Sequence, residues 1–360
     1  MIKNEYYVIG VMSGTSLDGI DLLYARFKYG KNWDFDIIKA ETIKYDEDWN
    51  GKLENLVNLS IEELKLIDKE YTHLLANVIS TFIAKYKIKC IDAICSHGHT
   101  AYHQPENKLT YQIGNQPIIS KLVGQTVVCD FRIQDVELGG QGAPLVPIGD
   151  KLLFPNYDFC LNLGGFANLS VDINNERIAF DVCPVNILLN YYVKKIGYDF
   201  DDKGKMASQG KQNDELLSKL NDLEFYRKSY PKSLGLEWVK TSVIPLIDEF
   251  NLEPPDILNT LCEHIAIQIS NEINKIKKGS VLITGGGTYN DYLINRIKSF
   301  SQNEIEVPSK QIIDFKEALI FALLGILRLR KETNCLKSVT GASKDHSSGN
   351  IFYPHKIYIN

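Results

Sequence analysis

Apolar runs alternate with glycine-rich polar turns along the first part of the chain. Residues 6–12 form the run YYVIGVM, which is followed by the turn SGTSLDG and by a second apolar run over residues 20–27. Two apolar runs joined by a short turn of Gly, Ser and Asp predict a β-hairpin. Residues 35–43 can add a third strand, and residues 61–86 have apolar positions at helical spacing, which predicts a long helix.

The pattern returns in the middle of the chain. Residues 159–163 and 169–173 are apolar runs on either side of the turn GGFAN, which predicts a second strand–turn–strand. Residues 280–284 predict a strand that leads through three glycines into a helix over residues 290–300. The same reasoning predicts further strands and helices at residues 90–95, 126–130, 186–195 and 315–330. Strands thus alternate with helices, and the repeated strand–turn–strand indicates an internally duplicated α/β fold.

The bulk composition indicates a folded protein of two domains. The chain has 360 residues, of which 44% are hydrophobic and 24% are charged, and domains hold roughly 150 residues each. The net charge of −5 comes without a block of like charge, so we expect neither a nucleic-acid partner nor an anionic membrane partner.

No apolar run approaches the roughly 18 residues of a membrane span. The seven cysteines include no CxxC pair, which fits reduced thiols and a cytoplasmic location.

The turn after the first apolar run has the composition of a phosphate-binding loop. Gly14 and Gly19 let backbone N–H groups point outward without obstruction, and such a group of amides binds anions. Thr15 and Ser16 add hydroxyl donors. We therefore expect this turn to hold the phosphates of ATP, although an ordinary hairpin turn has the same residue types.

Two acidic residues of this segment are candidates for Mg2+. Asp18 and Asp21 offer carboxylate oxygens, which Mg2+ binds directly or through water. Because the transfer of a phosphoryl group from ATP generally needs Mg2+, the two aspartates fit the same hypothesis as the turn.

Two later glycine turns strengthen the nucleotide hypothesis. A phosphate gripped by two turns would explain why both the first and the second turn exist, and the three consecutive glycines of the third allow a base or ribose to approach closely. The chain has no GKS or GKT of a Walker A loop after these glycines, and the spacing of a dinucleotide fingerprint is absent. The candidate ATP-binding residues of these turns are Asn162, Gly164, Gly165, Gly285, Gly286 and Gly287.

A single aspartate is the candidate general base. Asp181 stands at the end of the apolar run RIAF, before Pro184 and a predicted helix. A carboxylate at a strand end can project into a cleft and take a proton from a hydroxyl or a water. It can equally well cap the helix that follows.

The histidines cluster in the segment SHGHTAYH. Ser96, His97 and His99 are candidates for hydrogen bonds to substrate hydroxyls. His99 and His103 also have the i, i+4 spacing of a metal-binding pair. On this spacing, a metal-dependent transferase is an alternative interpretation. The pair would need a helix, however, whereas the glycine and the polar residues around it favour a loop.

Mixed charges beside a flexible glycine loop suit a sugar or sugar acid. Asp130, Arg132 and Asp135 precede the loop LGGQGAP; carboxylates accept from hydroxyls, and a guanidinium pairs with a carboxylate. A local salt bridge in a surface loop explains the same residues. Glu317 is the acidic residue of the apolar stretch EALIFALLG; it either faces a cleft or lies in the first turn of its helix, where the dipole favours a carboxylate.

Taken together, these motifs resemble the anhydro-N-acetylmuramic acid kinase family, a member of the actin/hexokinase/sugar-kinase superfamily. The matching segments run in the family's order over nearly the whole chain. They are GVMSGTSLDGID at 10–21, SHGHT at 96–100, DFR at 130–132, GGQGAPLVP at 139–147, NLGGFANLS at 162–170, the GGG segment at 285–287, EALIFALL at 317–324 and SVTGAS at 338–343.

The resemblance implies a duplicated ribonuclease H-like fold with a central cleft that closes on its substrate. We expect one domain over residues 1–135 plus 338–360 and the other over residues 136–337. The resemblance implies that an aspartate activates a water that opens the 1,6-anhydro ring of the sugar. The freed 6-oxygen then takes the γ-phosphoryl group of ATP, which gives N-acetylmuramic acid 6-phosphate for cell-wall recycling, with Mg2+ neutralising the phosphates.

By motif position the resemblance assigns the aspartate to Asp181, the adenosine segment to the glycines with Asn290, and substrate contacts to Asn186. The family normally has Asp-Thr-Gly-Pro-Gly-Asn at this motif, whereas this chain has DVCPVN over residues 181–186. A hydroxyl is lost and two small positions gain side chains, so we expect a more crowded sugar pocket. A kinase for a different amino-sugar derivative is therefore an alternative.

A second alternative is a nucleotide-binding ATPase or regulatory protein on the same fold. It would keep the three glycine turns without needing Asp181. The sequence leaves the oligomeric state open, although homodimers are common among such enzymes.

Overall fold

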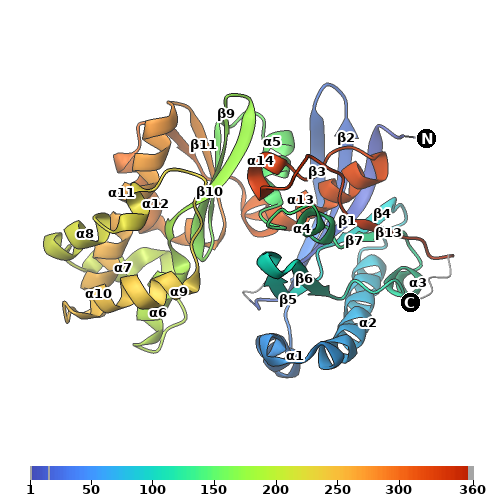
Figure 1. The fold of residues 1–360 in the computed structure, drawn as a ribbon, viewed down its shortest axis with the longest axis horizontal. Helices are drawn as coiled ribbons and strands as arrows, with labels where there is room; N and C mark the ends of the chain where they lie inside the picture. Colours follow the sequence, from blue (N-terminus) through green and yellow to red (C-terminus); the bar gives the residue numbers. More distant parts are fainter. Residues whose placement is uncertain (1, 15–16, 356–360) are drawn as a thin grey trace. The chain divides into compact units, whose positions relative to one another are not determined.

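A computed structural model describes residues 2–14 and 17–355, and the chain divides into two compact units. Unit 1 consists of Met1–Phe154 and Phe315–Asn360, and unit 2 consists of Pro155–Asp314. Each unit has one large mixed β-sheet with helices packed against it (Figure 1).

The sheet of unit 1 has six strands in the order β13-β7-β4-β1-β2-β3. Strands β1, β2 and β3 form an antiparallel meander, β4 runs parallel to β1, β7 runs parallel to β4, and β13 closes the edge antiparallel to β7. A separate antiparallel pair, β5 and β6, lies outside this sheet. The strands are β1 (Glu5–Ser13), β2 (Ile20–Tyr29), β3 (Trp33–Ile43), β4 (Ala93–Ser96), β5 (His99–Gln104), β6 (Leu109–Ile113), β7 (Val127–Cys129) and β13 (Asn350–Phe352).

Two long helices dominate unit 1. Helix α2 begins with a reciprocal capping box in which Ser60 and Glu63 bond to each other's backbone N–H groups. Helix α13 packs so closely on β1 that a Cβ at Gly10 would lie 2.0 Å from the carbonyl oxygen of Ala318. The helices are α1 (Glu47–Glu54), α2 (Ile61–Lys85), α3 (Ile119–Val123), α4 (Ile133–Glu137), α5 (Val146–Leu153), α13 (Lys310–Arg330) and α14 (Lys337–Thr340).

The sheet of unit 2 repeats the topology of the first. Its strand order is β10-β9-β8-β11-β12, with β8, β9 and β10 antiparallel and with β11 and β12 parallel to β8. This order matches β3-β2-β1-β4-β7 of unit 1 in sequence and direction. The strands are β8 (Phe159–Leu163), β9 (Phe166–Ile173), β10 (Glu176–Pro184), β11 (Ser280–Thr284) and β12 (Glu304–Glu306). The predicted duplicated α/β fold is confirmed.

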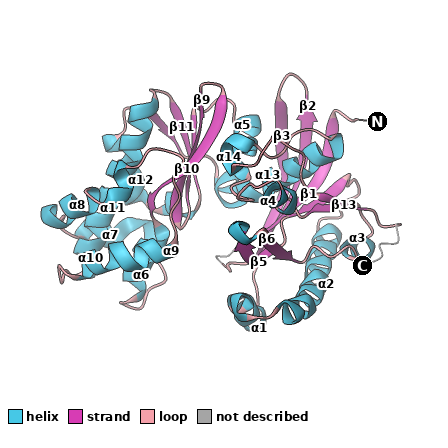
Figure 2. Ribbon diagram, viewed as in Figure 1, coloured by secondary structure: helices cyan, strands magenta, loops and turns pink. Residues whose placement is uncertain are grey.

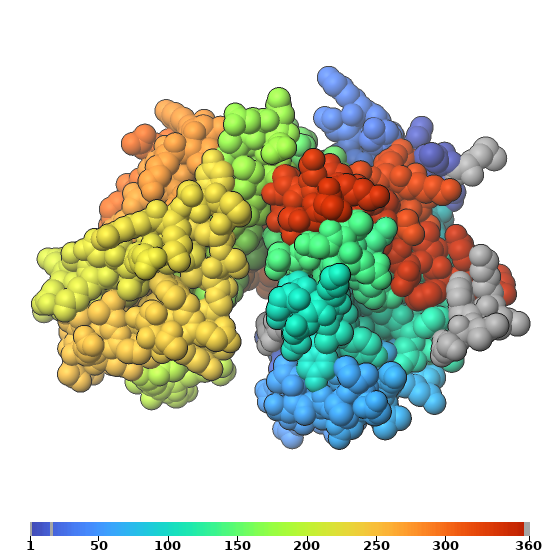
Figure 3. All heavy atoms as spheres, viewed as in Figure 1, coloured from blue at the N-terminus to red at the C-terminus, as the bar shows by residue number. Residues whose placement is uncertain are grey.

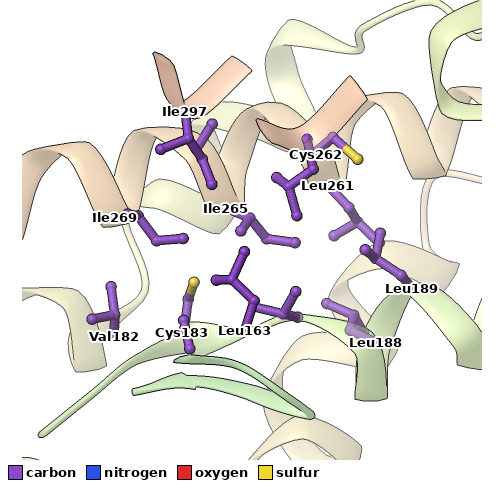
Figure 4. Packing of buried hydrophobic residues seen from close by; sticks show 14 of the residues in the cluster. Leu163, Val182, Cys183, Leu188, Leu189, Leu261, Cys262, Ile265, Ile269 and Ile297 are labelled. Atoms are coloured by element: carbon purple, nitrogen blue, oxygen red, sulfur yellow. The ribbon is translucent and has the colours of Figure 1, made fainter. Parts of the chain in front are cut away.

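Helix α11 forms the centre of unit 2. Its Leu261, Ile265 and Ile269 are fully buried and pack with Leu163 of β8 in one hydrophobic core (Figure 4). Figure 2 separates the strands from the helices that cover them. The helices of unit 2 are α6 (Asn186–Lys194), α7 (Lys205–Gln209), α8 (Asp214–Asn221), α9 (Leu236–Trp238), α10 (Ile244–Asp248), α11 (Pro254–Ile276) and α12 (Asp291–Phe300).

Three sequence expectations need adjustment. The turn expected over residues 164–168 is shorter, because β9 already begins at Phe166. His99, expected in a loop, is the first residue of strand β5. Helix α13 begins at Lys310, five residues before the expected start at residue 315. In the part of the chain that the structure describes, no helix is both long and apolar enough to span a bilayer.

The expected domain boundaries stay a prediction. The compact units change at residues 154/155 and 314/315, whereas the expected changes are at 135/136 and 337/338. The difference assigns α5 and most of α13 to unit 1. A buried ion pair joins these two helices, since Nζ of Lys316 lies 3.0 Å from Oδ1 of Asp150.

Candidate active site

In unit 1, strands β4 and β7 bring His97 and Arg132 together. The two strands are parallel neighbours, so the residues that follow them meet at the same edge of the sheet. Nε of Arg132 donates to Nε2 of His97 at 2.9 Å, and Nδ1 of His97 lies 2.8 Å from the carbonyl oxygen of Gly98. A carbonyl only accepts, so the proton of the neutral ring belongs on Nδ1. Burial, with the nearby Arg132 charge, holds the pKa of His97 well below its usual value, which keeps Nε2 free to accept.

Asp130 lies beside this pair and is held by two amides. Nδ2 of Asn115 donates to Oδ1 and Nδ2 of Asn350 donates to Oδ2, each at 3.0 Å. The backbone of Asp130 is left-handed, with φ of 59°, a conformation that aspartate tolerates better than most residues. Burial raises the pKa of Asp130 to about 6, against the opposite effect of the two amides. Asp130 can therefore accept hydrogen bonds from sugar hydroxyls as a carboxylate near neutral pH.

Glu317 of α13 shares the electrostatic environment of Arg132. Burial raises the pKa of Glu317, and the charges of Lys316 and Arg132 oppose that effect. Because α13 starts at Lys310, Glu317 is not in the first turn, and the helix-dipole explanation for this residue is wrong. NH1 of Arg132 is fixed by the carbonyl oxygen of Gly142 at 2.7 Å.

His99 belongs to a buried network behind the first glycine turn. Nδ1 of His99 lies 2.8 Å from Oγ of Ser13, which also accepts from the hydroxyl of Tyr71 at 2.9 Å. The hydroxyl of Tyr45 lies 2.6 Å from the same Oγ. Burial lowers the pKa of His99 to about 4, so the ring is neutral. This network rigidifies the strand end that leads into the turn.

Ser96 and His103 of the same segment have hydrogen-bond partners nearby in the chain. Oγ of Ser96 is fully buried and accepts from the N–H of Gly98 at 3.1 Å. His99 and His103 lie on a strand, not a helix, and Nδ1 of His103 lies 3.1 Å from Oγ1 of Thr110. On a strand, residues four positions apart are farther from each other than on a helix, so the two histidines do not form the helical metal-binding pair.

The first glycine turn connects β1 to β2. Thr15 and Ser16 lie outside the described residues, and the N–H of Leu17 bonds to the carbonyl oxygen of Gly14 at 3.3 Å. Gly19 has φ of +145°, and a Cβ there would lie 2.4 Å from the carbonyl oxygen of Ile43. Glycine at this position is thus required by the turn itself.

The two predicted Mg2+ ligands lie at the start of the second strand of the hairpin, one before it and one within it. Asp18 is exposed in the turn. Asp21 lies on β2, and its Oδ1 accepts from the hydroxyl of Thr42 at 2.5 Å.

In unit 2, the second and third glycine turns lie side by side. Strands β8 and β11 are parallel neighbours with Asn162 opposite Thr284, so the turns that follow them meet. A Cβ on Gly285 would lie 2.7 Å from Oδ1 of Asn162, and one on Gly287 would lie 2.7 Å from Cβ of Leu163. The third turn continues as a short 3₁₀ helix over Gly286–Tyr289. This geometry brings the glycines of the second and third turns close together.

The start of helix α6 is fastened to the second turn. The N–H groups of Val185 and Ile187 donate to the carbonyl oxygen of Gly165 at 2.8 and 3.3 Å, and that of Asn186 donates to Gly164 at 3.2 Å. These N–H groups are therefore occupied within the protein. Nδ2 of Asn186 donates to the carbonyl oxygen of Leu163 at 3.3 Å.

Asn290 has a clear structural partner as well. Its side-chain oxygen accepts from the N–H of Leu293 at 2.9 Å and so caps helix α12. This cap is a role that its position before the helix explains by itself.

The Asp181 carboxylate is oriented from both sides. Asn168 of the neighbouring strand β9 donates its amide to Oδ1 at 3.0 Å. The N–H of Leu234 donates to Oδ2 at 2.8 Å, and the hydroxyl of Ser233 approaches the same oxygen at 3.3 Å. These donors fix the plane of the carboxylate, as a positioned base requires. Asp181 does not cap helix α6, because the N-cap residue of that helix is Val185 and no side chain bonds to its first N–H groups.

The segment 230–234 supplies two of these donors, and the sequence pattern does not indicate this role. The N–H of Asp181 donates to the carbonyl oxygen of Lys232 at 3.0 Å, and the buried Nζ of Lys232 pairs with Glu272 at 2.8 Å. The ring of Tyr230 stacks on Phe180 with centroids 5.4 Å apart. The sequence signal was the cluster of Pro, Ser and Gly in YPKSLG, which predicts a turn but not its partner.

The three unusual residues of the Asp181 motif lie in the core of unit 2. Val182, Cys183 and Val185 are exposed by 1%, 0% and 0%. A bulge between Asp181 and Cys183 turns the strand here, and Figure 4 shows Val182 and Cys183 among the side chains packed beneath α11. The expectation of a more crowded sugar pocket is therefore wrong, because the added side chains fill the hydrophobic core instead.

Apart from the residues of the first hairpin turn and Asn290, the predicted residues form two groups. His97, Asp130, Arg132 and Glu317 gather in unit 1, with Ser96 and His99 next to them. Asn162, Gly164, Gly165, Gly285, Gly286, Gly287 and Asn186 gather in unit 2, and Asp181 stands in the same unit on β10.

Comparisons with known proteins give one consistent result. The family model described as anhydro-N-acetylmuramic acid kinase matches residues 6–354. A Sulfurimonas denitrificans protein of that name is 33% identical over 97% of this chain and 100% of its own length. A Haemophilus influenzae protein of the same name is 32% identical over 98% of both chains. Among solved structures, component A of the Acidaminococcus fermentans (R)-2-hydroxyglutaryl-CoA dehydratase has a TM-score of 0.49 at 12% identity, covering 91% of this chain and 100% of that one.

Proposed function

Because the chain belongs to the anhydro-N-acetylmuramic acid kinase family, we propose that it is an ATP-dependent sugar kinase. It opens the 1,6-anhydro ring of anhydro-N-acetylmuramic acid and phosphorylates the 6-oxygen. The product is N-acetylmuramic acid 6-phosphate, which serves cell-wall recycling. The observation that supports this best is the Asp181 carboxylate, which donors on both oxygens hold in one orientation.

Asp181 is the general base of the ring opening. It takes a proton from a water whose oxygen bonds to the anomeric carbon, and the bond between that carbon and the 6-oxygen breaks. The electron pair of that bond stays on the 6-oxygen, which attacks the γ-phosphorus of ATP and releases ADP. A positioned base of this kind contributes roughly 10²- to 10⁴-fold to the rate.

The cluster of unit 1 binds the sugar. Arg132 carries the positive charge that suits the carboxylate of a muramic acid, and its contact with His97 fixes the guanidinium. Asp130 and Glu317 accept from hydroxyl groups, and Ser96 and His99 support the same cluster. In unit 2, Asn186 completes the sugar contacts that the family motif implies.

The glycine turns bind ATP. Gly14, Thr15, Ser16 and Gly19 of the first turn, together with Asn162, the glycines of the other two turns and Asn290, form its contacts. Gly286 supports this assignment, because it is exposed. Among the described residues beyond its two chain neighbours, a Cβ there would have one neighbouring atom within 4 Å, Nδ2 of Asn186 at 3.8 Å. A nucleotide can therefore approach its backbone.

The residues of the first hairpin fit Mg2+. Asp18 and Asp21 are carboxylates, the ligand type that this hard cation prefers, and Asp18 is exposed. When bound with ATP, Mg2+ neutralises charge on the phosphates during transfer. Asp18 and Asp21 would hold it directly or through water.

The cellular setting follows from the same chemistry. All seven cysteines are free, and six of them are buried, which suits a reducing compartment rich in ATP, so we place the enzyme in the cytoplasm. A homodimer is the assembly we expect, which size-exclusion chromatography with light scattering would check.

A coupled assay of ADP release tests the function. Purified protein is given ATP and Mg2+ with 1,6-anhydro-N-acetylmuramic acid, with N-acetylmuramic acid, with N-acetylglucosamine, or with no sugar. We expect ADP release with the anhydro-sugar alone and one phosphorylated product by mass spectrometry. Equal ADP release without sugar would overturn the kinase in favour of an ATPase, and release with another sugar would identify a kinase for a different amino-sugar derivative.

A further inference from the structure

Three side chains that the proposed reaction does not use meet in the interior of unit 1. Asp135, Cys335 and His346 are exposed by only 0%, 1% and 7%. A carboxylate oxygen, the Sγ atom and a ring nitrogen of these residues all lie within 4.8 Å of one another. Carboxylate, thiolate and imidazole are together the ligand types of a d-block divalent cation.

The backbone brings Cys335 and His346 next to each other. The N–H of Cys335 donates to the carbonyl oxygen of His346 at 3.1 Å, and the N–H of His346 donates back at 3.2 Å. Residues that exchange both bonds in an antiparallel pair carry their side chains on the same face. The bridge therefore holds thiol and imidazole side by side.

Asp135 is fixed independently of the other two. The N–H of Gly142 donates to Oδ2 at 2.7 Å, and the hydroxyl of Thr340 donates to Oδ1 at 2.7 Å. The segment around Thr340 also bonds to the glycine loop, since the N–H of Gln141 donates to the Thr340 carbonyl at 2.8 Å. Figure 3 shows this C-terminal segment, in red, lying against the green loop segment.

His346 presents a lone pair that nothing in the described protein satisfies. Its Nδ1 lies 3.1 Å from the carbonyl oxygen of Lys344, so in the neutral ring Nδ1 carries the proton. Nε2 is then an acceptor, it is buried, and it has no hydrogen-bond partner among the described residues. It faces Oδ1 of Asp135 at 3.5 Å. Two lone pairs facing each other in a buried site repel unless a positive charge lies between them.

A proton on His346 or a metal ion can supply that charge, and the geometry favours the metal. A distance of 3.5 Å is long for a charge-assisted hydrogen bond. Two tetrahedral ligands that each bind Zn2+ at roughly 2.0–2.2 Å lie about 3.3–3.6 Å apart. An ion pair between Asp135 and His346 would not explain why the thiol of Cys335 lies beside them. In a metal site, the thiolate and the carboxylate together balance the charge of a divalent cation.

We propose that Asp135, Cys335 and His346 form a structural binding site for a thiophilic divalent cation of the Zn2+ class. The cation joins the C-terminal segment to helix α4 and the glycine loop. That loop provides the carbonyl oxygen of Gly142, which fixes NH1 of Arg132. The metal therefore stabilises the loop that positions Arg132 of the sugar-binding cluster. It is distinct from Mg2+, which prefers oxygen ligands.

The test uses the full-length, tag-free protein with Zn2+ or Co2+ as the probe. The protein is first stripped of metal with a chelator and dialysed. After Zn2+ is added back and the excess is removed, we expect one Zn2+ per chain by elemental analysis and a higher midpoint of thermal unfolding than in the stripped protein. Adding Co2+ to the stripped protein should give a thiolate-to-cobalt charge-transfer band. Cys335→Ala and His346→Gln should weaken binding by at least about tenfold and abolish the cobalt band. Cys90→Ser, which removes the exposed thiol, and Cys262→Ala, which removes a buried thiol of unit 2, should keep both.

An ion pair between Asp135 and a protonated His346 predicts the opposite. The wild-type protein would then show neither a cobalt–thiolate band nor a zinc-dependent thermal shift, and that result would overturn the site. Binding that disappears in Cys90→Ser, or persists unchanged in Cys335→Ala, would overturn it too. If a cluster variant does not fold, as far-ultraviolet circular dichroism would reveal, the cobalt spectrum of the wild-type protein decides alone.

Discussion

The backbone N–H of Leu234 donates a 2.8 Å hydrogen bond to Oδ2 of Asp181, although the two residues are 53 positions apart in the chain. The other oxygen of the carboxylate accepts from the amide of Asn168 at 3.0 Å. A backbone donor cannot rotate away, and the segment that carries it is anchored by the buried pair of Lys232 and Glu272. The orientation of the proposed base is thus built into the fold of unit 2.

Replacing Asp181 by Asn tests the base directly. The variant keeps the size of the side chain but cannot accept a proton, so sugar-dependent kcat should fall by about 10²- to 10⁴-fold. ATP affinity, measured by isothermal titration calorimetry, should stay within twofold of wild type, because the glycine turns are untouched. Retained sugar turnover in Asp181→Asn would contradict the assignment.

The donors around Asp181 should contribute unequally. A hydrogen bond to a charged group contributes roughly 1.5–3 kcal/mol, so Asn168→Ala should lower kcat by about tenfold or more. Ser233→Ala should have a smaller effect, because its hydroxyl approaches at 3.3 Å. For a positioning role, KM for the sugar and ATP affinity should change little in both variants. Equal effects, or a loss expressed mainly in KM, would argue against it.

Two neighbouring glycines separate the needs of the fold from those of the ligand. Gly285 has φ of +88°, and a Cβ there would lie 2.7 Å from the carbonyl oxygen of Leu163, so Gly285→Ala should lower the thermal stability of the protein. Gly286 has no such constraint, so Gly286→Val should fold with a nearly unchanged melting temperature. Its ATP affinity should nevertheless fall by tenfold or more, because the side chain blocks the approach of the nucleotide. Unchanged ATP affinity in Gly286→Val would remove the third turn from the ATP site.

A buried histidine of unit 2 makes stability depend on pH. His264 lies between Oδ1 of Asn221 and the hydroxyl of Tyr226, at 2.7 and 2.9 Å, and burial lowers its pKa to about 3. The unfolded chain takes up the proton near pH 6.5 and the folded chain does not, so the free energy of unfolding falls as the pH drops from about 6.5 to about 3. The contribution is fully present above pH 6.5. The slope is at most about 1.4 kcal/mol per pH unit.

His264→Gln checks this slope by urea unfolding at several pH values. The variant should show a shallower loss of stability between pH 6.5 and 4 than the wild type, since glutamine does not titrate. Parallel curves for the two proteins would show that the histidine is protonated in the folded state as readily as in the unfolded one.

The strands next to glycine turns could be predicted from the sequence because their signals are local. The runs at residues 159–163 and 280–284 have the predicted bounds, and the repeated strand–turn–strand reveals the duplication. The hydrophobic pattern does not predict helix α11, Pro254–Ile276. Its isoleucines and leucines are spread among Asn, Thr, Gln and Glu that are themselves buried, such as Asn259, Thr260 and Gln268. A helix buried on most sides lacks a clear polar face, so periodicity does not reveal it.

The candidate site divides in the same way. The sequence indicates Asp181 because it follows an apolar run, and Arg132 because it precedes a glycine-rich loop. The expected strand end at Asp181 is wrong, since β10 continues to Pro184. It does not indicate Leu234 or Asn350, which act through a backbone N–H and a long-range amide. It also misjudges Val182 and Cys183, because only the bulge in β10 shows on which side of the sheet they lie.

The insertion of unit 2 into unit 1 sets an order of events during synthesis. Unit 2 is one uninterrupted segment, whereas unit 1 needs Phe315–Asn360 to provide Ala318 against Gly10 and β13 against β7. A chain that stops at residue 314 should therefore contain a protease-resistant fragment from unit 2 and a readily digested N-terminal part, as mass spectrometry after limited proteolysis would show. Resistance of the N-terminal part would contradict this order. On the ribosome, the N-terminal segment of unit 1 therefore emerges first but completes its fold last, after unit 2 and the C-terminal segment have been synthesised.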